Sequence, residues 1–197
     1  MTRAGRSTTT KPKNGVREDP ASAYDMTQHD EGVEQRTLAC IVDNEPGVLA
    51  RVVGLFSARG YNIESLTVAE IDRNAHQSRI TIVTSGTNHV LEQIEQQLLR
   101  LVPVAKVIDV THSVGGIQRE LALVKVAGKG EHRVEALRIS EIFRARVVDT
   151  TNESFIFEIT GASSKVDQFT ELMRPLGLIE VSRTGVLSIQ RGKEKAG

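Results

Sequence analysis

The distribution of apolar residues predicts alternating strands and helices over most of the chain. Short β-branched apolar runs are typical of strands, and apolar residues three and four positions apart are typical of helices. From Leu38 onward these patterns follow each other in the order βαββαβ. The expected strands are residues 37–42, 63–71, 78–84 and 106–111, and the expected helices are residues 46–59 and 88–101. Gly60 is placed to end the first helix, and Thr87 is a suitable N-cap for the second.

The same order of elements repeats in the second half of the chain. The expected strands are residues 120–126, 146–151, 155–160 and 179–189, and the expected helices are residues 131–145 and 164–176. We therefore predict an α+β fold with two ferredoxin-like βαββαβ modules, each a four-stranded antiparallel sheet with two helices on one face. The predicted boundaries are a tail over residues 1–35, modules over 36–113 and 119–192, a linker over 114–118 and a short tail over 193–197.

Two strands of the first module are apolar on both alternations, residues 37–42 and 79–84. A sheet with helices on one side only would then expose an apolar outer face or edge, which normally pairs with another chain. The pattern therefore predicts a homodimer.

Composition excludes several classes of protein. The 197 residues carry 25 basic and 25 acidic side chains, and aromatic residues make up only 4%. Such a chain has no general attraction to nucleic acid or anionic membranes, and it offers few aromatic rings for base stacking. No apolar run reaches the roughly 18 residues of a membrane span. The single cysteine, Cys40, cannot form an internal disulfide; we expect an inert core thiol in a reducing compartment.

The first 35 residues contain almost no large apolar side chain, so we expect a disordered tail there. The tail lacks the apolar stretch of a secretory signal and the apolar face of an organelle transit peptide. These features predict a bacterial-like cytoplasmic protein and assign no role to the tail.

The junction between the first strand and the first helix is a candidate binding site. Its sequence runs Asp43-Asn44-Glu45-Pro46-Gly47-Val48, and Pro46 suits the first position of a helix. An open helix N-terminus at Gly47 would attract a small carboxylate, and Asp43 or Asn44 could accept hydrogen bonds from an ammonium group. Asn62, at the start of the next strand, could complete a site for a free amino acid, either within one chain or across a dimer. The alternatives are a simple capped helix, with Asn44 as the cap, and an ordinary turn asparagine at Asn62.

No catalytic or metal-binding constellation is evident. The five histidines are scattered, and Gly128-Lys129-Gly130 lacks the remaining residues of a phosphate-binding loop. RNA-recognition modules share the βαββαβ order, but they stack bases on strand aromatics that residues 38–42 and 80–84 lack.

The stretch from Asn44 to Val68, with Asn44-Glu45-Pro46-Gly47-Val48-Leu49 and Gly60-Tyr61-Asn62-Ile63-Glu64, resembles the small, regulatory subunits of acetolactate synthase (acetohydroxyacid synthase). The resemblance extends through Glu120-Leu121-Ala122-Leu123-Val124, Glu141-Ile142-Phe143-Arg144-Ala145 and Gly185-Val186-Leu187-Ser188-Ile189. It covers residues 36–192, which leaves only the tails unmatched.

The resemblance implies an amino-acid-binding ACT domain over residues 36–113 and a related C-terminal regulatory domain. It implies a non-catalytic subunit that binds valine, or another branched-chain amino acid, at the ACT dimer interface. Such a subunit activates a separate catalytic subunit and confers feedback inhibition in branched-chain amino-acid biosynthesis. The implied effector-site residues are Asn44, Gly47 and Asn62, with Val48 and Ile63 beside them. Thiamine diphosphate, Mg²⁺ and FAD are expected on the catalytic subunit and not on this chain. The alternative is an ACT-domain regulator of another amino-acid pathway.

Overall fold

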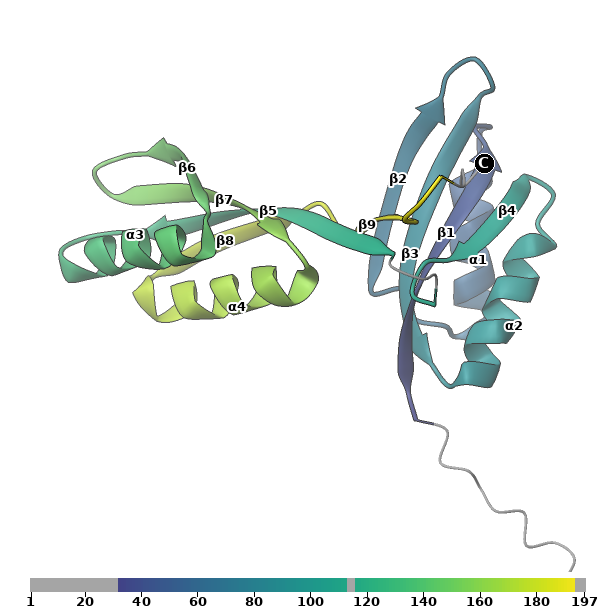
Figure 1. Ribbon diagram of the computed structural model, residues 1–197, viewed down its shortest axis with the longest axis horizontal. Coiled ribbons are helices and arrows are strands. Elements are labelled where there is room, and N and C mark those ends of the chain that lie inside the picture. Colours follow the sequence, from purple (N-terminus) through teal and green to yellow (C-terminus); the bar gives the residue numbers. More distant parts are fainter. Residues whose placement is uncertain (1–31, 113–115, 194–197) are drawn as a thin grey trace, which may run out of the picture. The chain divides into compact units, whose positions relative to one another are not determined.

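The computed structural model describes residues 32–112 and 116–193, and the first module within them is a four-stranded antiparallel sheet with two helices (Figure 1). Its elements are β1 (Glu34–Asp43), α1 (Val48–Arg59), β2 (Ser65–Asp72), β3 (Gln77–Gly86), α2 (Asn88–Leu99) and β4 (Val104–Asp109). The strand order is β2-β3-β1-β4, so β2 and β4 are the edges of the sheet. This order confirms the predicted ferredoxin-like module.

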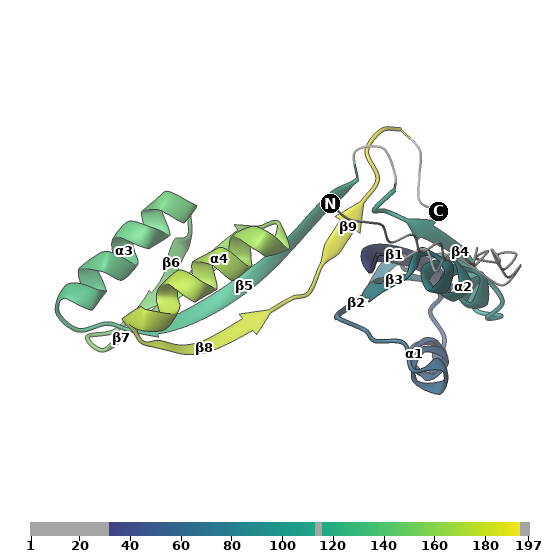
Figure 2. The ribbon, with the colours of Figure 1, turned by 90° about the horizontal axis from the view of Figure 1, so that it is seen from below.

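The second module repeats the same strand order, β6-β7-β5-β8. Its elements are β5 (Ile117–Ala127), α3 (Glu131–Phe143), β6 (Arg146–Thr150), β7 (Ser154–Gly161), α4 (Ser163–Met173), a 3-10 turn η1 (Arg174–Leu176), β8 (Leu178–Arg183) and β9 (Leu187–Ile189). The short strand β9 is the end of the last predicted strand, and it pairs with the first residues of β5 (Figure 2).

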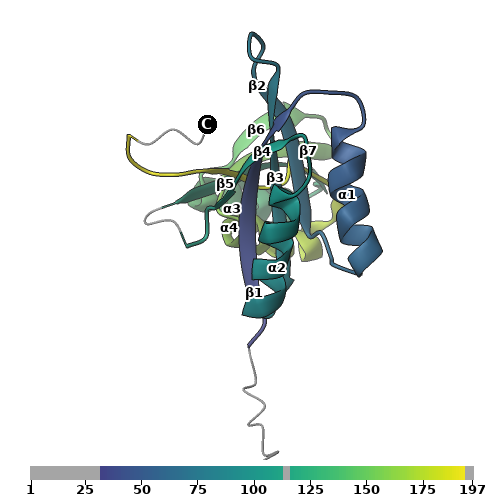
Figure 3. The ribbon, with the colours of Figure 1, turned by 90° about the vertical axis from the view of Figure 1, so that its right-hand side faces the viewer.

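Each module has its own hydrophobic core between its helices and one face of its sheet (Figure 3). In the first module, alternate residues of β1 and β3 meet the buried positions of both helices, which are three or four residues apart in each helix. The fully buried side chains there include Leu38, Ile80, Ile82, Phe56 and Leu91. In the second module, Val124, Phe157 and Ile159 of the sheet pack against Val166 and Phe169 of α4. No residue belongs to both cores.

The ends of the first two helices follow from single residues. Gly60 ends α1 in the left-handed conformation at φ 68°, and the Thr87 side chain accepts a hydrogen bond from the Val90 N–H at 3.5 Å. Both predictions are confirmed. The predicted start of α1 at Pro46 was two residues too early. Gly47, at φ 86°, cannot lie within a right-handed helix, so the helix begins at Val48.

The last predicted strand, residues 179–189, is divided in two. Between β8 and β9 the chain turns at Gly185, whose φ of 82° is incompatible with an extended strand. The first strands of the two modules also begin before the predicted strands at residues 37 and 120, with β1 at Glu34 and β5 at Ile117. Residues 114 and 115 of the proposed linker lie outside the described residues, as does the tail up to residue 31, and the last two linker residues, 117 and 118, belong to β5.

The outer face of the first sheet is already buried within the chain. Ala39 and Ile41 alternate with core residues along β1, yet they are only 0% and 1% exposed. Thr81 and Val83 on β3 are also buried. Exposed apolar surface on this face is therefore not a reason for pairing, and the predicted homodimer depends on the edge strand β2.

Candidate functional site

The N-terminus of α1 is the most open helix start of the first module. Gly47 is exposed, and a Cβ added to it would meet no atom within 4 Å. No side chain caps the helix, and its first turn contains no acidic residue. The amides of a first helical turn have no partner within the helix and carry a partial positive charge. This end of α1 can therefore bind a small carboxylate, whereas Thr87 already caps α2.

Asn44 lies beside this helix start, at the end of β1. Its backbone N–H donates to the carbonyl of His76 at 2.6 Å, and its Nδ2 donates to Glu70 at 3.5 Å. Arg51, in the first turn, pairs with Glu45 at 2.9 Å, so the basic charge near the helix start is balanced. Asn44 is therefore held by its backbone, and its exposed side chain can turn toward a ligand.

The two apolar residues of the predicted site lie in different environments. Val48 is 7% exposed and belongs to the hydrophobic core, so its side chain stabilises the start of α1. Ile63 is half-buried against the same core and keeps part of its surface open.

Asn62 lies at the other end of the module. Its carbonyl accepts a hydrogen bond from the Thr84 hydroxyl at 2.6 Å, next to the start of β2. Asn44 instead contacts Glu70, near the end of β2. The twelve-residue helix α1 separates Gly47 from Asn62 by about 18 Å. One protomer therefore does not bring Asn62 together with Asn44 and Gly47.

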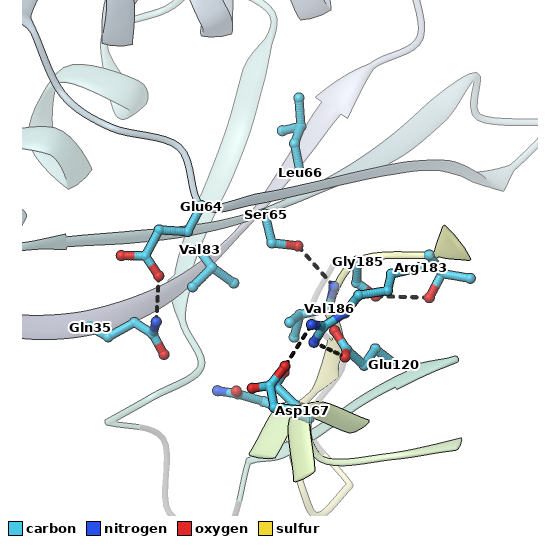
Figure 4. A pocket seen from close by; sticks show the side chains of 13 residues that line it. Gln35, Glu64, Ser65, Leu66, Val83, Glu120, Asp167, Arg183, Gly185 and Val186 are labelled. Atoms are coloured by element: carbon cyan, nitrogen blue, oxygen red, sulfur yellow. Dashed lines mark hydrogen bonds and ion pairs between the residues drawn. The ribbon is translucent and has the colours of Figure 1, made fainter. Parts of the chain in front are cut away.

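A polar cavity of about 480 Å³ lies beside the start of β2 and was not predicted from the sequence (Figure 4). Glu120, which is only 3% exposed, pairs there with Arg183, and Arg183 also contacts Asp167 at 2.6 Å. Burial lowers the pKa of Arg183, but the hydrogen bonds and charges of Asp167 and Glu120 outweigh burial, so the pKa is raised. Arg183 is thus held as a cation between two carboxylates.

The sequence does contain a signal for this region. Glycine inside a run of strand residues indicates a bulge or a close approach of two backbones, and Gly185 follows Val181-Ser182-Arg183-Thr184. The partner of such a glycine cannot be read from a single sequence. It is β2, more than a hundred residues away.

The remaining candidates carry no site. Cys40 is fully buried, as predicted for a core thiol, and burial raises its pKa to about 12. Among the described residues, no three His, Cys, Asp or Glu side chains are grouped so as to hold a metal ion. The strand aromatics Phe155 and Phe157 are 4% and 0% exposed, so they cannot stack on RNA bases. No helix in the described part of the chain is long and apolar enough to cross a membrane.

Comparison with known proteins matches both modules. The family described as "AHAS small subunit-like ACT domain" matches residues 38–106, and "Small subunit of acetolactate synthase" matches residues 119–192. The chain is 47% identical over 161 residues to the "Probable acetolactate synthase small subunit" of Archaeoglobus fulgidus, covering 82% of this chain and 99% of that one. It is 44% identical over 159 residues to the acetolactate synthase isozyme 3 small subunit of Escherichia coli, covering 80% and 96%.

A solved structure agrees over the same region. The acetolactate synthase small subunit from Thermotoga maritima has a TM-score of 0.74 and 37% sequence identity, covering 82% of this chain and 99% of that one. Two ACT-type modules in this arrangement define a regulatory chain. More particularly, the chain belongs to the family of acetolactate synthase small subunits, which confirms the resemblance seen in the sequence. That membership implies a partner catalytic subunit and a role in branched-chain amino-acid biosynthesis.

Proposed function

We propose that this chain binds valine, or another branched-chain amino acid, and thereby controls the activity of an acetolactate synthase catalytic subunit. The observation that carries the proposal is the uncapped N-terminus of α1, where Gly47 leaves both space and amide donors for a carboxylate. Asn44 supplies a carbonyl oxygen for the ammonium group of the same ligand, and Ile63, which adjoins Asn62 at the other end of the protomer, supplies its apolar surface only across a dimer.

A homodimer formed through β2 supplies the remaining polar group. β2 is an edge strand, and Val68 and Ile71 on it are 44% and 49% exposed. Two edge strands related by a two-fold axis run antiparallel, so the start of one lies beside the end of the other. This pairing places Asn62 of the partner subunit toward Gly47 and Asn44. The separation of these residues within one protomer is thus what a site shared by two protomers requires.

The shared site gives the effector its influence on activity. A ligand shifts a conformational equilibrium only through its different affinities for the two states. A movement between protomers would break half of this site, so the effector favours one arrangement of the dimer. We propose that the effector-free dimer activates the catalytic subunit, which carries thiamine diphosphate, Mg²⁺ and FAD, and that the effector-bound dimer inhibits it.

Substitution of Gly47 tests the carboxylate site. In Gly47→Asp, a carboxylate occupies the amides that would bind the effector, so we expect valine inhibition of the reconstituted holoenzyme to be abolished while activation remains. Gly47→Ala is the control for the strain that any side chain meets at φ 86°, and Gly54→Asp is the control for the added charge, because Gly54 lies exposed on the same helix and its Cβ would also meet no atom within 4 Å. Both controls should remain sensitive to valine. Full sensitivity of Gly47→Asp as well would show that the helix start is not the site.

Substitution of Asn62 tests the dimeric part of the site. Its side chain is exposed, and its hydrogen bond with Thr84 uses only its backbone carbonyl, so Asn62→Ala should leave the fold unchanged. Loss of hydrogen bonds to a charged ligand should raise the valine concentration for half-inhibition by about tenfold or more.

Calorimetry with a panel of free amino acids distinguishes valine control from the regulation of another pathway. One methylene group changes affinity by only about 1–3 kcal/mol, so leucine and isoleucine should bind within a factor of about 10–200 of valine. Binding of an amino acid outside this group, and of none within it, would favour the alternative pathway.

A further inference from the structure

The segment between β8 and β9 changes its partner within four residues. Both modules belong to one unit of the chain, Gly32–Gly197. Arg183 and the N–H and hydroxyl groups of Thr184 are bound to the second module, whereas the Thr184 carbonyl, Gly185 and Val186 contact β2 of the first (Figure 4). This segment is therefore a direct physical connection between the two cores.

Two hydroxyl groups of β2 hold the backbone of Val186 on both sides. The Val186 N–H donates to Ser65 Oγ at 3.0 Å, and Thr67 Oγ1 donates to the Val186 carbonyl at 3.2 Å. Ser65 and Thr67 are two residues apart on a strand, so their side chains point to the same face, opposite to Leu66, which packs on the core. The Val186 side chain is only 6% exposed. Val186 is thus docked by both its polar backbone groups and its side chain.

Only glycine allows this approach at position 185. Its φ is 82°, and a Cβ there would lie 2.8 Å from both Ser65 Oγ and Thr67 Oγ1. These hydroxyl oxygens are held by their hydrogen bonds to Val186, so a side chain at position 185 could be accommodated only by rotating them away and breaking those bonds. A side chain at position 185 would therefore push the segment away from β2.

The preceding residues are fixed to the second module. The Thr184 N–H donates to the carbonyl of Leu121 at 3.0 Å, and Thr184 Oγ1 accepts from the Leu121 N–H at 3.1 Å. Arg183 pairs with the buried Glu120 and with Asp167. A displacement of Ser65 and Thr67 would therefore be transmitted to β5 and α4 through only two or three residues.

The docking point is also next to one part of the proposed effector site. Ser65 follows Asn62 by three residues, and the intervening chain is held by the Glu64 N–H bond to the Val83 carbonyl at 2.8 Å. A shift at Asn62 when the effector binds would therefore move Ser65 as well. Residues 62–67 therefore belong both to the proposed effector site and to the contact with the C-terminal module.

We propose that Ser65 and Thr67 are positioning residues that couple effector binding in the ACT domain to the C-terminal module through Gly185 and Val186. This inference rests on the proposed function and adds the route by which the second module senses the effector. The contact itself binds no effector. Removal of this contact should weaken inhibition by valine without weakening the affinity for valine.

The test compares valine affinity with valine inhibition in the full-length chain and its holoenzyme. The variant Ser65→Ala/Thr67→Val removes both hydroxyls while retaining side-chain volume at position 67. We expect the Kd for valine, measured by calorimetry, to stay within about threefold of the wild-type value. The valine concentration for half-inhibition should rise by about tenfold, since two hydrogen bonds are lost, or maximal inhibition should fall. Gly185→Ala is the second variant and should act in the same direction.

Thr150→Val is the matched control, since it removes an exposed strand hydroxyl on the edge strand β6 that bonds only within the second module, and its inhibition should be unchanged. Equal inhibition in the double variant and the wild type would overturn the coupling role. A parallel loss of affinity and inhibition would also overturn it, because the residues would then belong to the effector site or its fold. Failure of the wild-type chain itself to bind any branched-chain amino acid would instead overturn the proposed function, and the coupling proposal with it.

Discussion

The two modules share one strand order, but the loops that begin their first helices differ in charge. α1 begins after Gly47 and has no acidic residue in its first turn. α3 begins after Gly130 with Glu131, which already supplies a negative charge to its N-terminus. Nearby, Lys129 pairs with Glu153 at 3.5 Å. The two helix starts therefore differ in first-turn charge although the modules share a fold, and only the start of α3 already has a carboxylate beside its amides.

The outer faces of the sheets show a second difference. On β1, Ala39 and Ile41 are buried, whereas Leu123, on the outer face of β5, is 40% exposed and lies beside the Lys125–Glu180 ion pair. Of the corresponding edge strands, β6 is exposed at every residue, whereas β2 is half-buried over its first three residues and exposed over the rest. The first module is thus the one whose sheet is protected on both faces.

The cores differ in composition, and this difference gives the largest predicted effect. Phe157 lies 6.0 Å from Phe169 and 5.5 Å from Phe155 between ring centroids, within an aromatic core. Phe157→Ala should destabilise the second module by about 3–5 kcal/mol because it leaves a large cavity. Hydrogen exchange should then accelerate in β5, β7 and α4 while the protection of β1 and β3 is retained.

Phe56→Ala is the reciprocal variant, since Phe56 is 1% exposed in the first core. It should accelerate exchange in β1 and β3 and leave β7 protected. If either substitution removed hydrogen-exchange protection from both sheets to the same extent, the two modules would unfold as one cooperative unit. The two cores would then not stabilise their modules independently.

Alkaline pH should affect the first module through Cys40, the single cysteine of the chain. Burial raises the pKa of its thiol from 9.0 to about 12, so the folded state retains a proton that the unfolded state loses above pH 9. The stabilising contribution is complete below pH 9 and is lost as the pH rises toward 12. Stability should fall by up to about 1.4 kcal/mol per pH unit in this window.

Urea unfolding of wild type and Cys40→Ala between pH 8 and pH 11 measures this contribution. The difference in unfolding free energy between the two proteins should shrink as the pH rises, because only the wild type carries the buried thiol. A pH-independent difference would show that the thiol ionises equally in both states.

Local sequence predicted the fold because each element has its own signal. The periodic apolar residues of α2 and the residues Gly60 and Thr87 at helix ends act over a few positions, so they were correctly interpreted. The start of α1 was misplaced because Pro46 fits a first helical turn equally well, and the conformation of Gly47 depends on its surroundings.

The contacts between distant segments could not be predicted in this way. Ser65 and Thr67 have the pattern of any exposed strand, and nothing local associates them with Val186, 121 residues beyond Ser65. Likewise, Asn44 and Asn62 were grouped from the expected chemistry, but only the register of β2 and β3 shows that they lie at opposite ends of the protomer. The sequence therefore indicated which residue types could bind an amino acid, but it did not indicate the distances between them.

The smallest predicted effect makes the first turn of α1 resemble that of α3. Ala50 is exposed in that turn, and Ala50→Glu adds the acidic charge that Glu131 supplies in the second module. The interaction with the helix dipole should stabilise the chain by about 0.3–1 kcal/mol. The same charge repels the effector carboxylate, so valine affinity should fall by about tenfold. Stability and affinity should therefore move in opposite directions.

Thermal unfolding and calorimetry measure the two quantities in parallel. Gln96→Glu is the matched control, since it places the same charge on an exposed position of α2, away from the start of α1. It should leave valine affinity unchanged. A loss of valine affinity in both variants would attribute the effect to the net charge of the module. An unchanged affinity in Ala50→Glu would show that the open start of α1 is not what distinguishes the first module from the second as the proposed effector domain.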